Sequence, residues 1–131
     1  MALTVARTFV QVDDVDLAVS FYRDALGLAV LMDVPKDDYR WVTVGSPSQP
    51  DVCLVITNYV DGSPEDVAAV AALVAKGVLP GVHFHSDDLD GDFEKIAATG
   101  VDVVQEPTTQ FWGRDCAVRD PSGNLVRIDQ T

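Results

Sequence analysis

The chain has 131 residues, the size of one ordinary domain, and its 47% hydrophobic and 23% charged residues are typical of a folded protein. Nine Lys and Arg side chains stand against 21 Asp and Glu, a formal net charge of −12 that argues against nucleic acid as a partner. No apolar run is long enough to cross a membrane, and the N-terminal stretch lacks an uninterrupted signal-peptide core, so we expect a cytoplasmic protein.

The same series of signals occurs twice along the chain, at offsets of 72 to 74 residues. Residues 5–58 and 80–131 each predict a strand, a helix and then three strands. The connecting residues 59–79 contain Ser63 and Pro64 before an Ala- and Val-rich stretch, which predicts a helix that ends at Gly77. The sequence therefore predicts an α+β fold of two tandem βαβββ modules in a single domain over 1–131.

Each predicted module helix has a start and a stop signal. Asp14 and Asp88 can accept hydrogen bonds from the free amides of the first turn, and Gly27 and Gly100 stand where a left-handed residue ends a helix. The apolar spacing predicts that the core-facing positions are Leu17, Phe21 and Ala25 in the first helix and Leu89, Phe93 and Ile96 or Ala97 in the second.

The strands also carry local predictions. A loop is expected at Glu106–Gln110, and Asp120–Asn124 reads as a tight turn between two strands. Cys53 and Cys116 lie in apolar strands without metal-ligand spacing, so we expect buried reduced thiols.

Strand alternation separates the core face from the opposite face. The core face is expected to hold Val10, Val12, Val82, Phe84, Val126 and Ile128. The opposite face is expected to hold Arg7, Phe9, Gln11, Cys53, Val55, Thr57, Gly81, His83, His85, Leu125, Arg127 and Asp129.

The segment FYRDALGL after an acidic-ended strand, together with WGRDCAVRDPSGNLVRI near the C-terminus, resembles the vicinal oxygen chelate superfamily. This group includes glyoxalase I, extradiol dioxygenases and bleomycin resistance proteins. The resemblance covers nearly the whole chain and implies that each module curls into half of a cup-shaped mixed sheet. It also implies a homodimer, but it does not fix the function.

The same resemblance identifies four positions where metal-dependent members carry ligands. They are Arg7 and Gly81 in the first strand of each module, and Val55 and Arg127 in the last. Glycine and valine have no donor atom, and arginine stays protonated. We therefore expect no metal at the usual place and no cofactor.

The residues of the opposite face supply candidate ligand contacts. His83 and His85 are candidates for ligand contact or for general acid–base catalysis, although a hydrogen-bonded role within the sheet or a metal pair is also open. Arg7 and Arg127 suit a carboxylate or phosphate, or else pair with nearby acids such as Asp129.

Aromatic side chains are expected to wall the cup, and ordinary core or dimer packing is the alternative for each. The ligand-binding candidates that complete the set are Phe9, Gln11, Trp41 and Trp112, and Phe111 lies beside them. The sequence thus predicts a metal-independent protein that binds a small organic or antibiotic-like compound. The alternative is a glyoxalase-like lyase, isomerase or other enzyme that uses the cup His and Arg residues, with or without a divalent metal.

Overall fold

The structure, a computed structural model, describes all 131 residues and divides into two compact units. Unit 1 is Met1–Ala72 and unit 2 is Leu73–Thr131. Each unit contains one copy of the predicted βαβββ series, so the predicted repeat is confirmed. No helix is both long enough and apolar enough to span a membrane.

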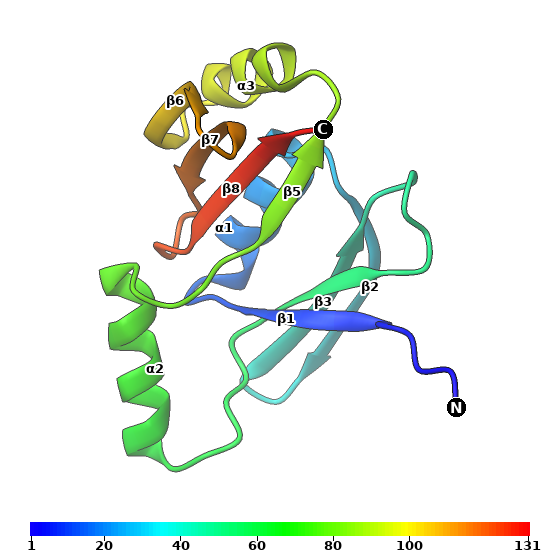
Figure 1. The fold of residues 1–131 in the computed structure, drawn as a ribbon. Coiled ribbons are helices and arrows are strands. Elements are labelled where there is room, and N and C mark those ends of the chain that lie inside the picture. Colours follow the sequence, from blue (N-terminus) through cyan, green and yellow to red (C-terminus); the bar gives the residue numbers. More distant parts are fainter. The chain divides into compact units, whose positions relative to one another are not determined.

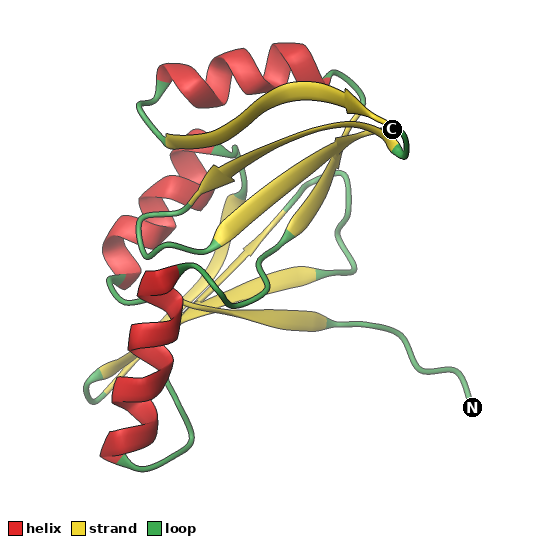
Figure 2. Cartoon of the chain, turned by 60° about the vertical axis from the view of Figure 1, so that its left-hand side comes forward, coloured by secondary structure: helices red, strands yellow, loops and turns green.

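Unit 1 is one mixed sheet with a helical segment packed on it (Figures 1 and 2). The strand order is β1-β4-β3-β2, with β1 parallel to β4 and the other pairs antiparallel. The elements are β1 (Arg7–Gln11), α1 (Val15–Ser20), the π-helical η1 (Phe21–Ala25), β2 (Ala29–Lys36), β3 (Tyr39–Gly45) and β4 (Cys53–Thr57).

Unit 2 repeats this arrangement with the order β5-β8-β7-β6, and α3 packs on β6, β7 and β8 (Figure 2). The helix α2 (Pro64–Lys76) crosses the boundary between the units. The other elements are β5 (His83–Ser86), α3 (Leu89–Ala98), β6 (Asp102–Gln110), β7 (Gly113–Arg119) and β8 (Leu125–Gln130). Two four-stranded mixed sheets with helices confirm the α+β class.

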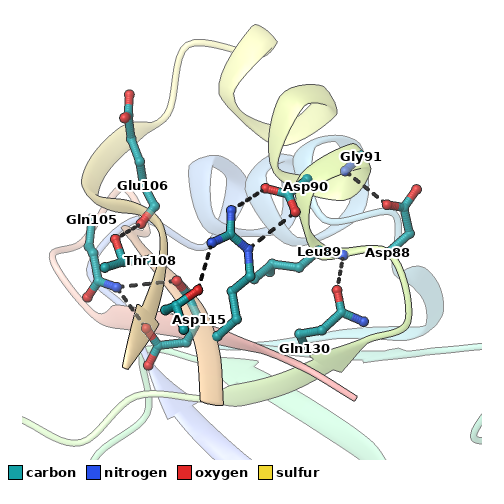
Figure 3. Close-up of polar contacts among 11 residues, drawn as sticks. Asp88, Leu89, Asp90, Gly91, Gln105, Glu106, Thr108, Asp115 and Gln130 are labelled. Atoms are coloured by element: carbon teal, nitrogen blue, oxygen red, sulfur yellow. Dashed lines mark hydrogen bonds and ion pairs between the residues drawn. The ribbon is translucent and has the colours of Figure 1, made fainter. Parts of the chain in front are cut away.

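The predicted helix ends are all confirmed. The Leu17 amide donates to the Asp14 carboxylate at 3.0 Å, and the Gly91 amide donates to that of Asp88 at 3.2 Å (Figure 3). Gly27 and Gly100 adopt φ of 75° and 86°, the left-handed region in which a side chain is strained.

The predicted core stripe of the first helix is wrong at Leu17, which is 57% exposed. Because the helix begins at Val15 directly after its cap, the inward positions are Val15, Ala18, Val19 and Tyr22. The π-helical turn then widens the backbone, with the Leu26 amide donating to the Phe21 carbonyl at 3.1 Å. Phe21 and Tyr22 are consequently both buried.

The connecting helix begins as predicted, since the Asp66 amide donates to the Ser63 hydroxyl and the Ser63 amide donates back to the Asp66 carboxylate. The loop predicted at Glu106–Gln110 is wrong, because β6 runs through these residues. Proline is tolerated there because β6 is an edge strand whose pairing with β7 is irregular between Gln105 and Thr108.

One ion pair recurs in both units and ties the third strand of the module to the first turn of its helix. Arg40 on β3 pairs with Asp16 on α1, and Arg114 on β7 pairs with Asp90 on α3 at 2.7 Å. These positions correspond at an offset of 74 residues. Both pairs are partly exposed, so they fix geometry more than they stabilise the fold.

The two cysteines differ in burial, so we expect them to differ in reactivity. Cys116 is fully buried, and burial together with the nearby Asp115 raises the pKa of its thiol to about 11. Cys53 is partly exposed, so the prediction of a buried thiol is wrong at this position. At pH 8, a thiol reagent is expected to modify one cysteine per native chain and two per unfolded chain. Cys53→Ser should abolish the native reaction, and equal native reaction of both thiols would contradict this prediction.

Candidate functional site

An aromatic pair covers the middle of the unit 1 sheet on the face away from α1. Phe9 on β1 lies opposite Val55, and Trp41 on β3 lies opposite Thr57. The two rings meet edge to face with centroids 5.2 Å apart, across the intervening strand β4. This pair explains why Val55 and Thr57 are 0% and 1% exposed although the alternation assigns them to the open face.

A cavity of about 540 Å³ lies beside this pair, towards the β2–β3 hairpin. Trp41 forms one wall, and the rings of Tyr39 and Tyr59, with centroids 4.9 Å apart, form another. Met32 and Val34 contribute exposed apolar surface. The remaining lining residues are Lys36, Asp37, Arg40 and Thr57.

The polar groups around this cavity are mostly satisfied by other protein groups. The Arg40 guanidinium is bidentate to Asp33 at 3.0 and 2.7 Å and also pairs with Asp16, so its charge is neutralised. Gln11 donates to the Tyr59 carbonyl at 2.7 Å, which anchors that tyrosine. Apart from Lys36 and Asp37, which are of opposite sign, the cavity therefore offers mainly aromatic and apolar surface.

The corresponding positions of unit 2 carry polar residues instead. His83 on β5 lies opposite Arg127 on β8, where unit 1 has Phe9 opposite Val55. Asp115 on β7 lies opposite Asp129, where unit 1 has Trp41 opposite Thr57. The two repeats thus share one backbone plan but present surfaces of opposite character.

Asp115 is the centre of a buried polar network in unit 2, and its side chain is only 2% exposed. Its carboxylate accepts from Gln105 Nε2 at 2.7 Å, Trp112 Nε1 at 3.3 Å and Arg127 Nη1 at 3.3 Å (Figure 3 draws the Gln105 contact). Burial raises the pKa of this carboxyl, but the three donors outweigh burial and lower the pKa overall. Asp115 is therefore ionised at neutral pH.

A polar recess of about 460 Å³ opens beside this network. It brings together three of the predicted site residues, His83, Trp112 and Arg127. Its other lining residues are Gln105, Gln110, Asp115 and Asp129. His85 lies one pair further along, opposite Asp129, and does not line the recess.

The predicted site residues therefore fall into two groups. Phe9, Gln11 and Trp41 lie in or beside the aromatic region of unit 1, and Arg7 is exposed on the edge strand β1 opposite Cys53. The roles of all eight candidates stay predictions. Five further lining residues are not among those predicted from the sequence: Tyr39, Tyr59, Gln105, Gln110 and Asp115.

The four positions that correspond to metal ligands do not fit a metal ion. Val55 is buried under the aromatic pair, and the Arg127 guanidinium is bonded to Asp115. At Gly81, an added Cβ would overlap the carbonyl group of Leu125 on β8, so the backbone leaves no room for a ligating side chain. No cluster of three or more His, Cys, Asp or Glu side chains has a geometry that could hold a metal.

The close approach at Gly81 leads to a stability prediction. Gly81→Ala is expected to lower the free energy of unfolding by about 1 to 2 kcal/mol, because the segment that leads into β5 must move away from Leu125 to admit the methyl group. Urea unfolding measures this loss. A Gly81→Ala variant as stable as the wild type would contradict the tight packing.

The chain belongs to the glyoxalase/bleomycin resistance protein/dioxygenase superfamily, whose family model matches residues 4–128. This finding confirms the resemblance that the sequence motifs suggested. The fold comparisons agree: the crystal structure of UcmS2 is 31% identical, covers 100% of both chains and superimposes with a TM-score of 0.89.

Two further relatives carry functional descriptions of their own. TnmS3, an antibiotic binding protein from Streptomyces sp. CB03234, is 32% identical over 99% of this chain and 98% of its own, with a TM-score of 0.76. EhpR of Enterobacter agglomerans, a phenazine antibiotic resistance protein, is 25% identical over 91% of this chain and 85% of its own. The chain is thus similar to proteins that bind or resist antibiotics.

Proposed function

We propose that this protein binds a small planar aromatic compound, noncovalently and without a metal ion, in the cavity of unit 1. The observation that carries the proposal is the wall of Trp41, Tyr39 and Tyr59 around about 540 Å³. This volume lies within the range of small-molecule sites, and flat rings gain most from stacked or edge-to-face aromatic contacts.

The electrostatics of the cavity support an uncharged aromatic body over a simple anion. Arg40 is already paired with two carboxylates, and the other two charged lining residues, Lys36 and Asp37, are of opposite sign. The nearby Asp61 carboxylate, which also pairs with the phenol, raises the pKa of Tyr59, so this ring stays uncharged at neutral pH. A flat, uncharged ring system fits these groups.

The comparisons support the antibiotic-like class of ligand, because TnmS3 is described as antibiotic-binding and EhpR as conferring resistance to phenazines. The proposal of metal independence rests on the four residues at the ligand positions, none of which offers a suitable donor. Binding of this kind would sequester the compound rather than transform it.

We propose in addition that the protein acts as a cytoplasmic homodimer. The edge strand β2 exposes Val30, Leu31 and Met32 at 39%, 60% and 56%, which is apolar surface that a second copy would cover. Light scattering tests this proposal, and a mass of 14.1 kDa across micromolar concentrations would contradict it.

Tryptophan fluorescence tests the site because the chain has two tryptophans, one in each unit. Phenazine should quench Trp41 saturably in a Trp112→Phe variant, with a dissociation constant of about 10 µM or tighter. The Trp41→Phe variant, whose only tryptophan is Trp112, should show no matching quench. Quenching of Trp112 alone, or no saturable signal up to about 1 mM, would contradict the proposal.

A further inference from the structure

The recess in unit 2 presents a cation and a carboxylate side by side. Arg127 and Asp129 are two residues apart on β8, so both side chains leave the same face of the strand, with Cα atoms about 7 Å apart. Both line the recess of about 460 Å³, together with His83 and the Trp112 indole.

The Arg127 guanidinium is held by one nitrogen and keeps its opposite edge unbonded. Nη1 donates to Asp115 Oδ2 at 3.3 Å and to Gln105 Oε1 at 3.4 Å, while Nε and Nη2 have no acceptor. The Nε–Nη2 edge is the fork that binds a carboxylate side-on through two parallel hydrogen bonds. The side chain is 28% exposed and lines the recess.

The charges of the recess argue against a simple anion as the ligand. The buried Asp115 carboxylate already balances the single charge of Arg127. The Asp129 carboxylate adds a second negative charge to the recess. A lone carboxylate on Arg127 would meet that charge at close range, whereas a ligand that also carries an ammonium group would balance it.

We infer that this recess binds the amino-carboxylate group of a zwitterionic small molecule. The ligand carboxylate lies on the Nε–Nη2 edge of Arg127, and the ammonium group faces Asp129. Asp115 is a positioning residue, since it fixes the guanidinium through Nη1 and so leaves the fork turned outwards. This inference uses residues of unit 2 only and does not rest on the function proposed for unit 1.

Three probes share a phenyl ring but differ in their charged groups. They are L-phenylalanine, which carries both groups, 3-phenylpropanoate, which carries only the carboxylate, and 2-phenylethylamine, which carries only the ammonium group. They are titrated into the Trp41→Phe variant, in which Trp112 at the recess is the only tryptophan and reports binding. L-Phenylalanine is expected to bind at least about tenfold tighter than either of the others. A propanoate or an amine that binds as tightly, or no saturable binding of L-phenylalanine, would overturn the inference.

Three substitutions test the roles of the individual charged groups. Asp129→Asn should weaken the binding of L-phenylalanine to the affinity of 3-phenylpropanoate. The propanoate itself should bind this variant as tightly as it binds the parent protein, or more tightly. Arg127→Gln should remove binding of both carboxylates, and Asp115→Asn should weaken both while leaving the amine unchanged. Circular dichroism checks that each variant is folded. Because Asp129 takes no part in the buried network, the Asp129→Asn variant tests the inference even if Arg127→Gln is unstable. An Asp129→Asn variant that retains the full preference for L-phenylalanine would overturn the inference.

Discussion

Replacing Asp115 with alanine is expected to lower the free energy of unfolding by about 3 kcal/mol. The side chain is 2% exposed and accepts from Gln105, Trp112 and Arg127. Its removal leaves a partly buried guanidinium without a counter-ion and Trp112 Nε1 without an acceptor, while Gln105 Nε2 keeps only the Asp115 carbonyl at 3.2 Å. An unpaired charge and an unpaired donor cost more than the lost contacts themselves. Urea unfolding at pH 7 measures the effect.

Asp115→Asn is the matched variant, because it keeps an acceptor but removes the charge. We expect a smaller loss of about 1.5 kcal/mol. Asp129→Asn, on the same face but outside the network, is expected to change stability by less than about 0.5 kcal/mol. A loss below about 1 kcal/mol for Asp115→Ala would contradict the structural role of the network.

The stabilising charge of Asp115 also has a pH dependence. Because its pKa is lower in the folded chain than in the unfolded chain, its contribution is complete above the unfolded pKa of about 4. The contribution is lost as the pH falls through the folded pKa. The stability gap between the wild type and Asp115→Asn should therefore narrow below about pH 4, and a gap that widens there would contradict the assignment.

Replacing Trp41 with alanine is expected to weaken the binding of a planar aromatic ligand by about 30-fold, which corresponds to about 2 kcal/mol. The indole forms one wall of the cavity and also packs against Phe9. Its loss removes the flat surface for the ligand and opens the cover over Val55 and Thr57. Isothermal titration with phenazine measures the change.

Trp41→Phe keeps an aromatic wall, so we expect it to retain most of the affinity that alanine loses. Phe111→Ala is the control for a large exposed ring outside the cavity, since Phe111 is 96% exposed and does not line it. Affinity that falls equally in the Phe111 and Trp41 variants would show that the cavity is not the binding site.

The fold could be predicted because its signals are local and occur twice. The caps at Asp14 and Asp88 and the glycines at 27 and 100 each act within one helical turn, and the structure has all four where the sequence placed them. Leu17 was mispredicted because several apolar stripes fit a short helix, and only the packing of Val15 and its neighbours selects one.

The site was harder to predict, because its main groups depend on contacts between strands. Asp115 looked like an isolated acid in RDCAVRD, although the repeat aligns it with Trp41. This alignment is the signal that places Asp115 on the face opposite the core, where Trp41 lies in unit 1. Tyr59 follows the last strand of its module, and only its contacts with Tyr39 and Gln11 bring it to the cavity.

Metal-independent binding of a planar aromatic compound at Trp41 can be tested in one titration. Protein purified without a histidine tag and treated with a chelator is titrated calorimetrically with phenazine, with and without added divalent metal. We predict saturable binding with the same affinity in both conditions and a loss of about 30-fold in Trp41→Ala. Binding that appears only with metal, or that is unchanged in Trp41→Ala, would contradict the account.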